Sequence, residues 1–160
     1  LSMADRIAVL NAGRIVQIGP PEHVYRVPQN EFVADFIGEA NFLTGNLLQT
    51  GPVKIKTPVG MLVSEMKSSS AAGTEVKCCI RPEKIQIRKK EGFLDTSPTN
   101  QIPATVQRVT YYGDMSQVEV QIGQGMQWTI SAFSAEAAEL SAGQAILCGV
   151  KPSDVILLGK

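Results

Sequence analysis

The side chains best suited to metal binding or nucleophilic chemistry are three cysteines and one histidine: Cys78, Cys79, Cys148 and His23. A structural zinc site usually takes its four ligands from two closely spaced pairs. Here there is no second cysteine pair, and the histidine is far away in sequence. A single histidine also leaves little room for a Ser/His/Asp or Cys/His catalytic arrangement. We interpret the thiols as reduced, mostly buried side chains, with Cys78 and Cys79 on opposite faces of one strand.

A nucleotide-binding motif is also missing from the sequence. The loop G-x-x-x-x-G-K-[ST], in which backbone amides surround phosphate groups, does not occur. The short stretch of Gly123, Gln124 and Gly125 is better explained as a hairpin turn. The sequence therefore assigns no catalytic, cofactor-binding or metal-binding residue.

One segment of the sequence occurs twice. GTEVKCCIRPEKIQI at residues 73–87 returns as GQAILCGVKPSDVIL at residues 143–157. Apolar and other residues alternate on both sides of a proline, which predicts a strand, a corner and a second strand in each copy. The matching positions with identical residues are Gly73 and Gly143, Cys78 and Cys148, and Pro82 and Pro152.

Each predicted corner has a cationic residue before its proline, Arg81 in the first copy and Lys151 in the second. The simpler interpretation is that the long side chain covers the corner and meets a nearby carboxylate. The alternative is that the corner is a contact surface for a partner. Neither copy resembles a catalytic motif.

Length and charge limit the possible functions. The chain has 160 residues, enough for one domain or for a small domain with an appendage. Fifteen basic residues balance fifteen acidic ones, so net charge does not favour nucleic acid or an anionic membrane. No apolar run is long enough to span a membrane, and no signal peptide opens the chain, so we expect a soluble protein without direct membrane insertion.

Residues 1–40 are expected to form a hairpin and two short helices. The first residues have the pattern of a helix end, and Asn11, Ala12 and Gly13 predict the turn of the hairpin. Pro21 begins the first helix, and Asn30 caps the second. The apolar stripe of the second helix contains Phe32, Val33, Phe36 and Ile37.

Residues 41–160 are expected to be mainly β. Roughly eight to ten short strands, separated by turn residues, predict a closed or nearly closed antiparallel barrel, or paired small barrels. Val106 and Val109 have opposite parity within one strand, which requires a bulge between them. Residues 89–101 are charged and rich in turn residues, so we expect a mobile loop there.

These segments together resemble a known family. LSMADRIAVLNAGRIVQIGPPEHVYRVPQNEFVADFIGEANFLTG resembles the stretch that follows the switch histidine in ATP-binding subunits of ABC importers, where a C-terminal regulatory domain begins. The corner IRPEKIQI, the turn YYGDMSQVEV and the end GVKPSDVILL resemble that regulatory domain, which is of the TOBE type. FIGEANFLTG is most similar to the spermidine/putrescine (polyamine) importers, although sugar, iron and thiamine importers have related joints.

The resemblance implies two regions. Residues 1–40 would be the hairpin-and-helix tail of an α/β ATPase domain. Residues 41–160 would be a TOBE-type regulatory domain, an OB-like antiparallel barrel built from two repeated strand-corner-strand units. The hairpin and the second helix would normally lie on the rest of the ATPase domain, so we expect their apolar side chains to be rearranged, exchanged between chains or packed on the barrel.

The function implied by the resemblance is regulation and dimerisation of an importer subunit. The full-length protein would bind ATP and Mg, and would couple ATP hydrolysis to uptake of a small solute such as a polyamine. Its partners would be a second copy and permease subunits, at the cytoplasmic side of the inner membrane. The signature motif, the acidic strand end for magnesium and the switch histidine do not occur in this sequence, so we expect this chain alone not to hydrolyse ATP.

Six residues are candidates for a dimer or regulatory contact surface, and Gly113 among them is explained better as a turn residue. They are Arg81, Glu83, Tyr112, Gly113, Asp114 and Lys151. One alternative function is a barrel that senses an oxyanion or another small ligand, for which Arg81, Lys84 and Arg88 are the available cations. Another is binding of single-stranded nucleic acid, but five Phe, three Tyr and one Trp at neutral charge argue against it.

Overall fold

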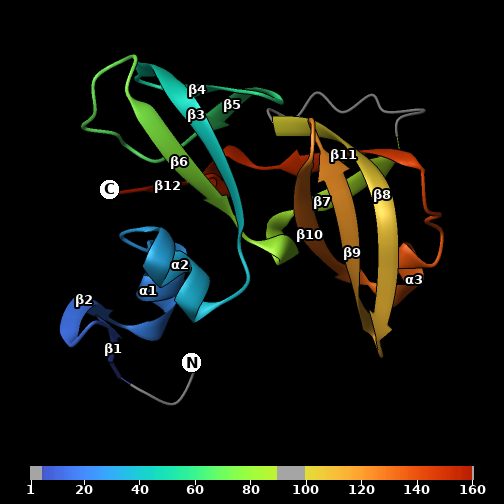
Figure 1. The fold of residues 1–160 in the computed structure, drawn as a ribbon, viewed down its shortest axis with the longest axis horizontal. Helices are drawn as coiled ribbons and strands as arrows, with labels where there is room; N and C mark the ends of the chain where they lie inside the picture. The colour runs from blue at the N-terminus through green and yellow to red at the C-terminus, as the bar shows by residue number, and fades with distance from the viewer. Residues whose placement is uncertain (1–4, 90–99, 160) are drawn as a thin grey trace.

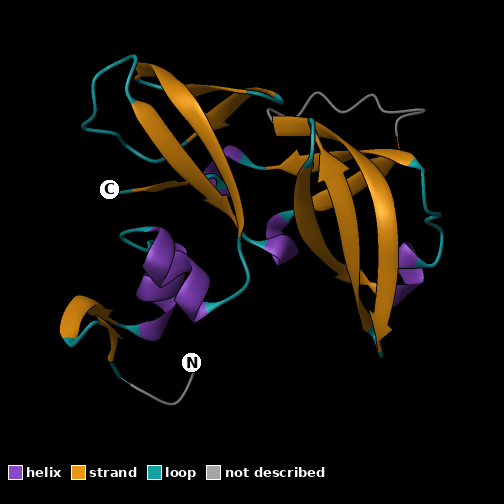
Figure 2. Ribbon diagram, in the orientation of Figure 1, coloured by secondary structure: helices purple, strands orange, loops and turns teal. Residues whose placement is uncertain are grey.

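The computed structural model describes residues 5–89 and 100–159 (Figure 1). These residues form a hairpin, three short α-helices and two five-stranded antiparallel sheets. Strands dominate the described part of the chain, and the longest helices belong to the N-terminal region (Figure 2). Most of the charged loop predicted at residues 89–101 lies outside the described residues.

The N-terminal region has the elements that the sequence predicts. Strands β1 (Ile7–Asn11) and β2 (Arg14–Gly19) form the hairpin, and Ala12 and Gly13 make its turn with φ angles of 51° and 76°. Helix α1 spans Pro21–Arg26. Helix α2 spans Glu31–Ile37, and the side chain of Asn30 accepts a hydrogen bond of 3.0 Å from the backbone N–H of Val33 at its start.

The two sheets have the same strand order. The first sheet is ordered β12-β6-β3-β4-β5, and the second is ordered β7-β11-β8-β9-β10. The strands of the first sheet are β3 (Asn41–Thr50), β4 (Val53–Thr57), β5 (Gly60–Ser64), β6 (Glu75–Ile80) and β12 (Ile156–Leu158). Those of the second are β8 (Asn100–Tyr112), β9 (Met115–Ile122), β10 (Met126–Phe133), β11 (Ala145–Val150) and β7 (Gln86–Lys89). A short helix, α3 (Ser134–Ala137), follows β10.

The repeated segment forms the crossing between the sheets. Each copy is a strand, a corner and a strand, as predicted, and the corners are the 3-10 helices η1 (Pro82–Lys84) and η2 (Pro152–Asp154). The two strands of one copy lie in different sheets, because β7 joins β11 and β12 joins β6. Each half of the β region therefore supplies one strand to the sheet of the other half.

The pairing of the exchanged strands is the same in both sheets. Cys78 of β6 lies opposite Leu157 of β12. Cys148 of β11 lies opposite Ile87 of β7. Cys78 corresponds to Cys148 in the repeated segment, and Ile87 corresponds to Leu157. The exchange therefore relates the two halves by an internal two-fold arrangement.

The internal repeat extends beyond the repeated segment of the sequence and includes the strands β3 and β8. The pairing of β3 with β4 shifts register after Leu47, and that of β8 with β9 shifts after Val106, where the sequence predicts a bulge. The backbone of Leu47 is hydrogen-bonded to the turn that contains Gly73, and the backbone of Val106 to the turn that contains Gly143. Both halves thus repeat the same bulged strand and the same anchoring turn.

Two buried asparagines join the edge of each sheet to the other sheet. Asn41 donates to the carbonyl oxygen of Thr129 in β10 and accepts from its N–H, both at 2.8 Å. Asn100 makes the same pair of bonds with Val63 in β5, at 2.9 and 2.8 Å. Each amide side chain therefore satisfies a peptide group that would otherwise lack a strand partner.

The inward-facing side chains of both sheets form one continuous core. Trp128 of the second sheet is 2% exposed, and its indole N–H donates to the carbonyl oxygen of Phe42 in the first sheet at 3.2 Å. Cys78 and Cys148 belong to this core. Cys79 faces the opposite side of β6, as predicted, where it packs with Ala34 of α2 and with Ile156.

The outer face of the first sheet explains where the helices pack. Cys79 and Ile156 give that face an apolar surface for Ala34. The matching positions in the second sheet are Gly149 and Gln86, which offer no comparable apolar surface. Residues of α2 therefore cover the first sheet only, and Figure 1 shows α1 and α2 beside it.

The expectation that residues 1–40 pack on the barrel is met in part, because Ala34 of α2 packs with Cys79 and Ile156 of the first sheet. Val33 and Ala34 of α2 face inward and are fully buried. Phe32 and Phe36 stack on each other with a centroid distance of 5.9 Å, and Phe36 is 66% exposed. The hairpin also exposes Leu10, Ile15 and Ile18. Val33 packs instead with Val9 of the hairpin and Val24 of α1.

We predict that Asn100→Ala lowers the free energy of unfolding by about 2 kcal/mol, because it removes two hydrogen bonds from a buried peptide group. Asn41→Ala should have a similar effect, since its bonds are equivalent. Urea denaturation followed by circular dichroism measures both. The matched control is Asn46→Ala, because Asn46 is exposed. Equal losses in all three variants would contradict the role of the two buried amides.

We predict that the three cysteines are unreactive toward a disulfide reagent at about pH 8 in the native state. Burial raises the pKa of Cys78 and Cys148 to about 12, and that of Cys79 to about 11, so little thiolate is present. Addition of urea should release all three thiols for reaction. Rapid stoichiometric labelling without urea would show that one of the thiols is accessible.

Candidate functional site

The first corner is built around a buried arginine. Arg81 is 2% exposed, and its Nη1 atom donates to the carbonyl oxygens of Ala34, Gly38 and Glu39 at 2.8, 3.2 and 3.0 Å. Nη2 donates to the carbonyl oxygen of Tyr25 at 3.2 Å. The guanidinium therefore binds the free carbonyl groups at the C-terminal ends of both helices, where the helix dipoles favour a positive charge.

The burial of Arg81 argues against its predicted place in a dimer or regulatory contact surface. The side chain is buried, and it meets backbone carbonyl groups rather than the nearby carboxylate that the simpler interpretation proposes. Its guanidinium carbon lies 4.2 Å from the centre of the Tyr25 ring, a cation–π distance. Only the planar, branched guanidinium can bind several carbonyl groups and stack on a ring at once.

Glu83 strengthens the same joint. The hydroxyl of Tyr25 donates to a carboxylate oxygen of Glu83. Burial raises the pKa of Tyr25, and the hydrogen bond to Glu83 raises it further. The phenol therefore stays protonated and remains a donor over the physiological pH range. Together, Arg81 and Glu83 attach α1 and α2 to the β region.

Lys151 occupies the equivalent position in the second corner but is exposed. The outer face of the second sheet beside it offers no apolar surface comparable to that of the first sheet, on which α2 packs. The two cations that the repeat places before its prolines thus have different environments. Arg81 is an internal joint, whereas Lys151 remains at the surface.

Tyr112, Gly113 and Asp114 lie far from both corners. They form the turn between β8 and β9 at one end of the second sheet, whereas α1 and α2 lie beside the first sheet (Figure 1). Gly113 has a φ of 72°, as expected of a turn glycine. The backbone N–H of Ser134 donates to the carbonyl oxygen of Asp114 at 2.7 Å, which fixes the turn against the start of α3. The six candidate residues therefore do not form one site.

An exposed apolar row crosses the second sheet at this turn. Tyr112, Met115 and Phe133 lie directly opposite one another on β8, β9 and β10. Their exposed fractions are 63%, 37% and 68%. The sequence analysis missed Met115 and Phe133, although both stand at outward positions of alternating strands. We call these three residues the apolar row.

The two corners meet α1 at a pocket with a volume of about 290 Å³. We call it the corner pocket. Of the three cations considered for a small-ligand site, Arg81 and Lys84 line it, whereas Arg88 donates to Gln86 on β7 instead. The residues that carry its polar chemistry are Tyr25 and Arg26 from α1, Arg81 and Lys84 from the first corner, and Ser153 and Asp154 from the second.

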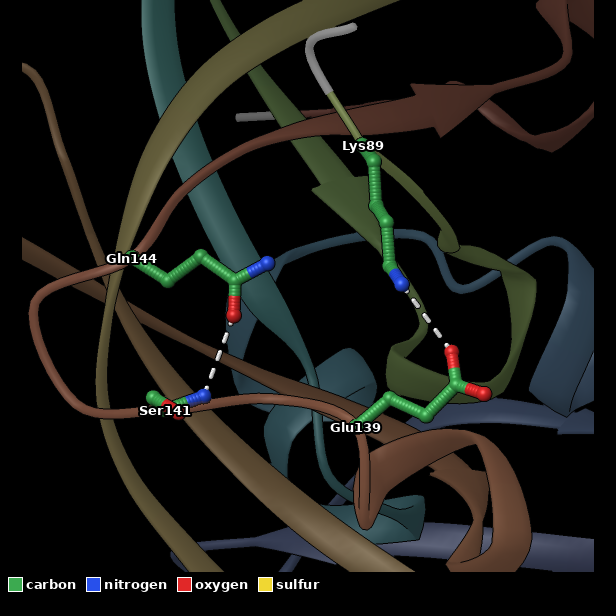
Figure 3. A network of polar contacts seen from close by, with 4 residues as sticks. All are labelled: Lys89, Glu139, Ser141 and Gln144. Carbon is green, nitrogen blue, oxygen red and sulfur yellow. Dashed lines mark hydrogen bonds and ion pairs between the residues drawn. The ribbon is translucent and has the colours of Figure 1, made fainter.

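Other polar contacts are structural. Lys89 of β7 pairs with Glu139 at 3.0 Å, and the backbone N–H of Ser141 donates to the side chain of Gln144 at 3.0 Å (Figure 3). These contacts hold the connection between α3 and β11 at the surface. An exposed pair of this kind contributes little stability.

Two general features of the described residues concern metal binding and membrane spanning. Within residues 5–89 and 100–159, His, Cys, Asp and Glu side chains do not gather in groups of three or more that could hold a metal ion. In the same part of the chain, every helix is too short or too polar to cross a membrane.

We predict that Arg81→Met lowers the free energy of unfolding by about 3 kcal/mol, because four carbonyl groups at the helix ends lose their donor. Lys151→Met at the equivalent exposed corner should change it by less than about 0.5 kcal/mol. Urea denaturation compares the two variants. A similar effect of both would refute the assignment of Arg81 as the joint between the helices and the sheets.

Comparisons with known proteins agree with this architecture. A family model described as the TOBE domain matches residues 78–158. The spermidine/putrescine import ATP-binding protein PotA 1 of Pseudomonas aeruginosa is 37% identical over 99% of this chain, and PotA of Fusobacterium nucleatum is 34% identical over 86%. The alignments cover 42% and 38% of those relatives, so the chain spans about two fifths of their length.

A solved structure shows the same fold. The cytoplasmic molybdate-binding protein ModG superposes with a TM-score of 0.68, and the match covers 75% of this chain and 96% of that one at 20% identity. The predicted mainly β, OB-like fold is thereby confirmed. The chain belongs to the TOBE domain family, and it is similar to ATP-binding subunits of ABC importers of the spermidine/putrescine type.

Proposed function

We propose that the two sheets form the regulatory and dimerisation domain of the ATP-binding subunit of an ABC importer. In this proposal, the full-length protein couples ATP hydrolysis to the uptake of a polyamine. The similarity to spermidine/putrescine import ATP-binding proteins supports this solute over a sugar, iron or thiamine.

The observation that supports the dimerisation role is a difference between the two halves of the β region. Both halves have the same strand order, but their outer faces differ. The first half is covered on its outer face by α2, and its corner is occupied by Arg81. Among the described residues, α2 packs on the first half only, and the second half exposes the apolar row. Exposed apolar side chains that lie together are typical of protein interfaces. A second copy of the chain is the partner that fits this row.

The remaining parts of the proposal concern the full-length protein. Residues 1–40 are the tail of the ATPase domain, and the exposed Leu10, Ile15 and Ile18 contact the rest of that domain. ATP and Mg bind there. Permease subunits also contact that domain, and they hold the protein at the cytoplasmic side of the inner membrane.

We predict that the 160-residue chain is a homodimer in solution, with the apolar row in the interface. Light scattering after size-exclusion chromatography gives the mass over a range of concentrations. Phe133→Ser should weaken dimerisation at least about tenfold, which corresponds to ~1.4 kcal/mol.

The matched control is Met61→Ser, because Met61 is also exposed but lies on β5 of the first sheet. It should leave the mass unchanged. A wild-type chain that remains monomeric at every concentration would refute the dimerisation role. An equal effect of both variants would refute the assignment of the interface to the apolar row.

A further inference from the structure

We propose that the corner pocket binds a small anionic ligand that carries a phosphate or carboxylate group. The pocket brings together three cations, Arg26, Arg81 and Lys84, and they come from α1 and from the first corner. Asp154 of the second corner is the acidic residue in the lining. Glu83 adjoins the lining as the acceptor of the Tyr25 hydroxyl, and the lining together with Glu83 still has one more positive than negative charge, which favours an anion.

The buried arginine is the strongest argument for an anion. Arg81 has backbone carbonyl groups as its hydrogen-bond partners, and among the described residues it forms no ion pair with a carboxylate. Its Nε atom is buried without any hydrogen-bond partner. Carbonyl dipoles compensate a buried positive charge only in part, so an anion beside the guanidinium would stabilise it further.

The other two cations are free to reorient toward a ligand. Lys84 is exposed at the rim of the first corner. Arg26 pairs with Glu22 at 3.0 Å, but both side chains are at least 70% exposed. Because an exposed pair one helical turn apart is weak, a ligand can compete for the Arg26 guanidinium. Ser153 adds a hydroxyl donor from the second corner.

The size of the pocket limits the ligand. A volume of about 290 Å³ accommodates a phosphate or citrate ion, or a small organic phosphate. A polyamine has the wrong charge, since three cations would repel it. The pocket therefore differs in chemistry from a site for the proposed transported solute.

The position of the pocket gives the ligand a structural effect. An anion there would contact α1 and both corners at once, and so would connect residues 1–40 to both halves of the β region. Its binding would strengthen the joint that Arg81 forms. The inference does not depend on dimerisation, because the apolar row and the lining of the corner pocket share no residue.

The test is a calorimetric titration of the 160-residue chain with inorganic phosphate and, separately, with citrate, at constant ionic strength. We expect saturable binding of at least one anion, and the comparison identifies the preferred group. Lys84→Gln should weaken binding at least about fivefold, because it removes one of the attracting charges. The control is Lys56→Gln on the exposed face of β4, which should have no effect.

Asp154→Asn is the sharpest variant, since it removes the acidic residue that opposes an anion. It should tighten binding of the anion severalfold. In amide NMR spectra, the shifts caused by the anion should concentrate at Tyr25, Arg26, Lys84 and Ser153. Absence of saturable binding, equal effects of Lys84→Gln and Lys56→Gln, or spermidine binding that Asp154→Asn abolishes would each overturn the inference.

Discussion

Two prolines turn the chain out of the sheet that it has just entered, and the architecture of the β region depends on this turn. Pro82 and Pro152 fix the backbone at the two corners and cannot donate to a strand pair, so the ladder has to end there. The strand after each corner finds its partner in the opposite sheet. Neither half completes its sheet alone, and the side chains of both halves share one core.

The same constraint allows the two halves to differ in function. The two halves keep the same geometry because they exchange strands, share one core and are joined by equivalent buried asparagines. The side chains on their outer faces are free to vary. In the first half, Cys79 and Arg81 accept the helices of residues 1–40. In the second half, Gly149 and Lys151 at the matching positions do not. Duplication thus supplies one half for attachment and one half with an open surface.

Local patterns in the sequence predicted the elements but not their partners. The repeated segment predicted strand, corner and strand, and the parity of Val106 and Val109 predicted the bulge, because both depend on neighbours along the chain. Alternation shows which face of a strand is buried, but it does not show which sheet the strand joins. The repeat of Asn41 in Asn100 was missed, because their separation in sequence differs from that of the repeated segments.

The candidate site was predicted less well, because its contacts join residues that are far apart in sequence. The burial of Arg81 depends on carbonyl groups of residues that lie some forty positions earlier in the chain, and no local pattern reports such a contact. The cations of the corner pocket also come from segments far apart in sequence. Only the turn role of Gly113 followed from its immediate neighbours.

The exchange of β12 has a consequence for synthesis on the ribosome. β6 forms early in the nascent chain, but its pairing with Ile156 and Leu157 has to wait until β12 has left the exit tunnel. Until then, β6 presents an open edge to other nascent chains. Completion of the first sheet therefore has to follow synthesis of the whole second sheet, and a premature stop codon shortly before β12 would leave that edge permanently unpaired.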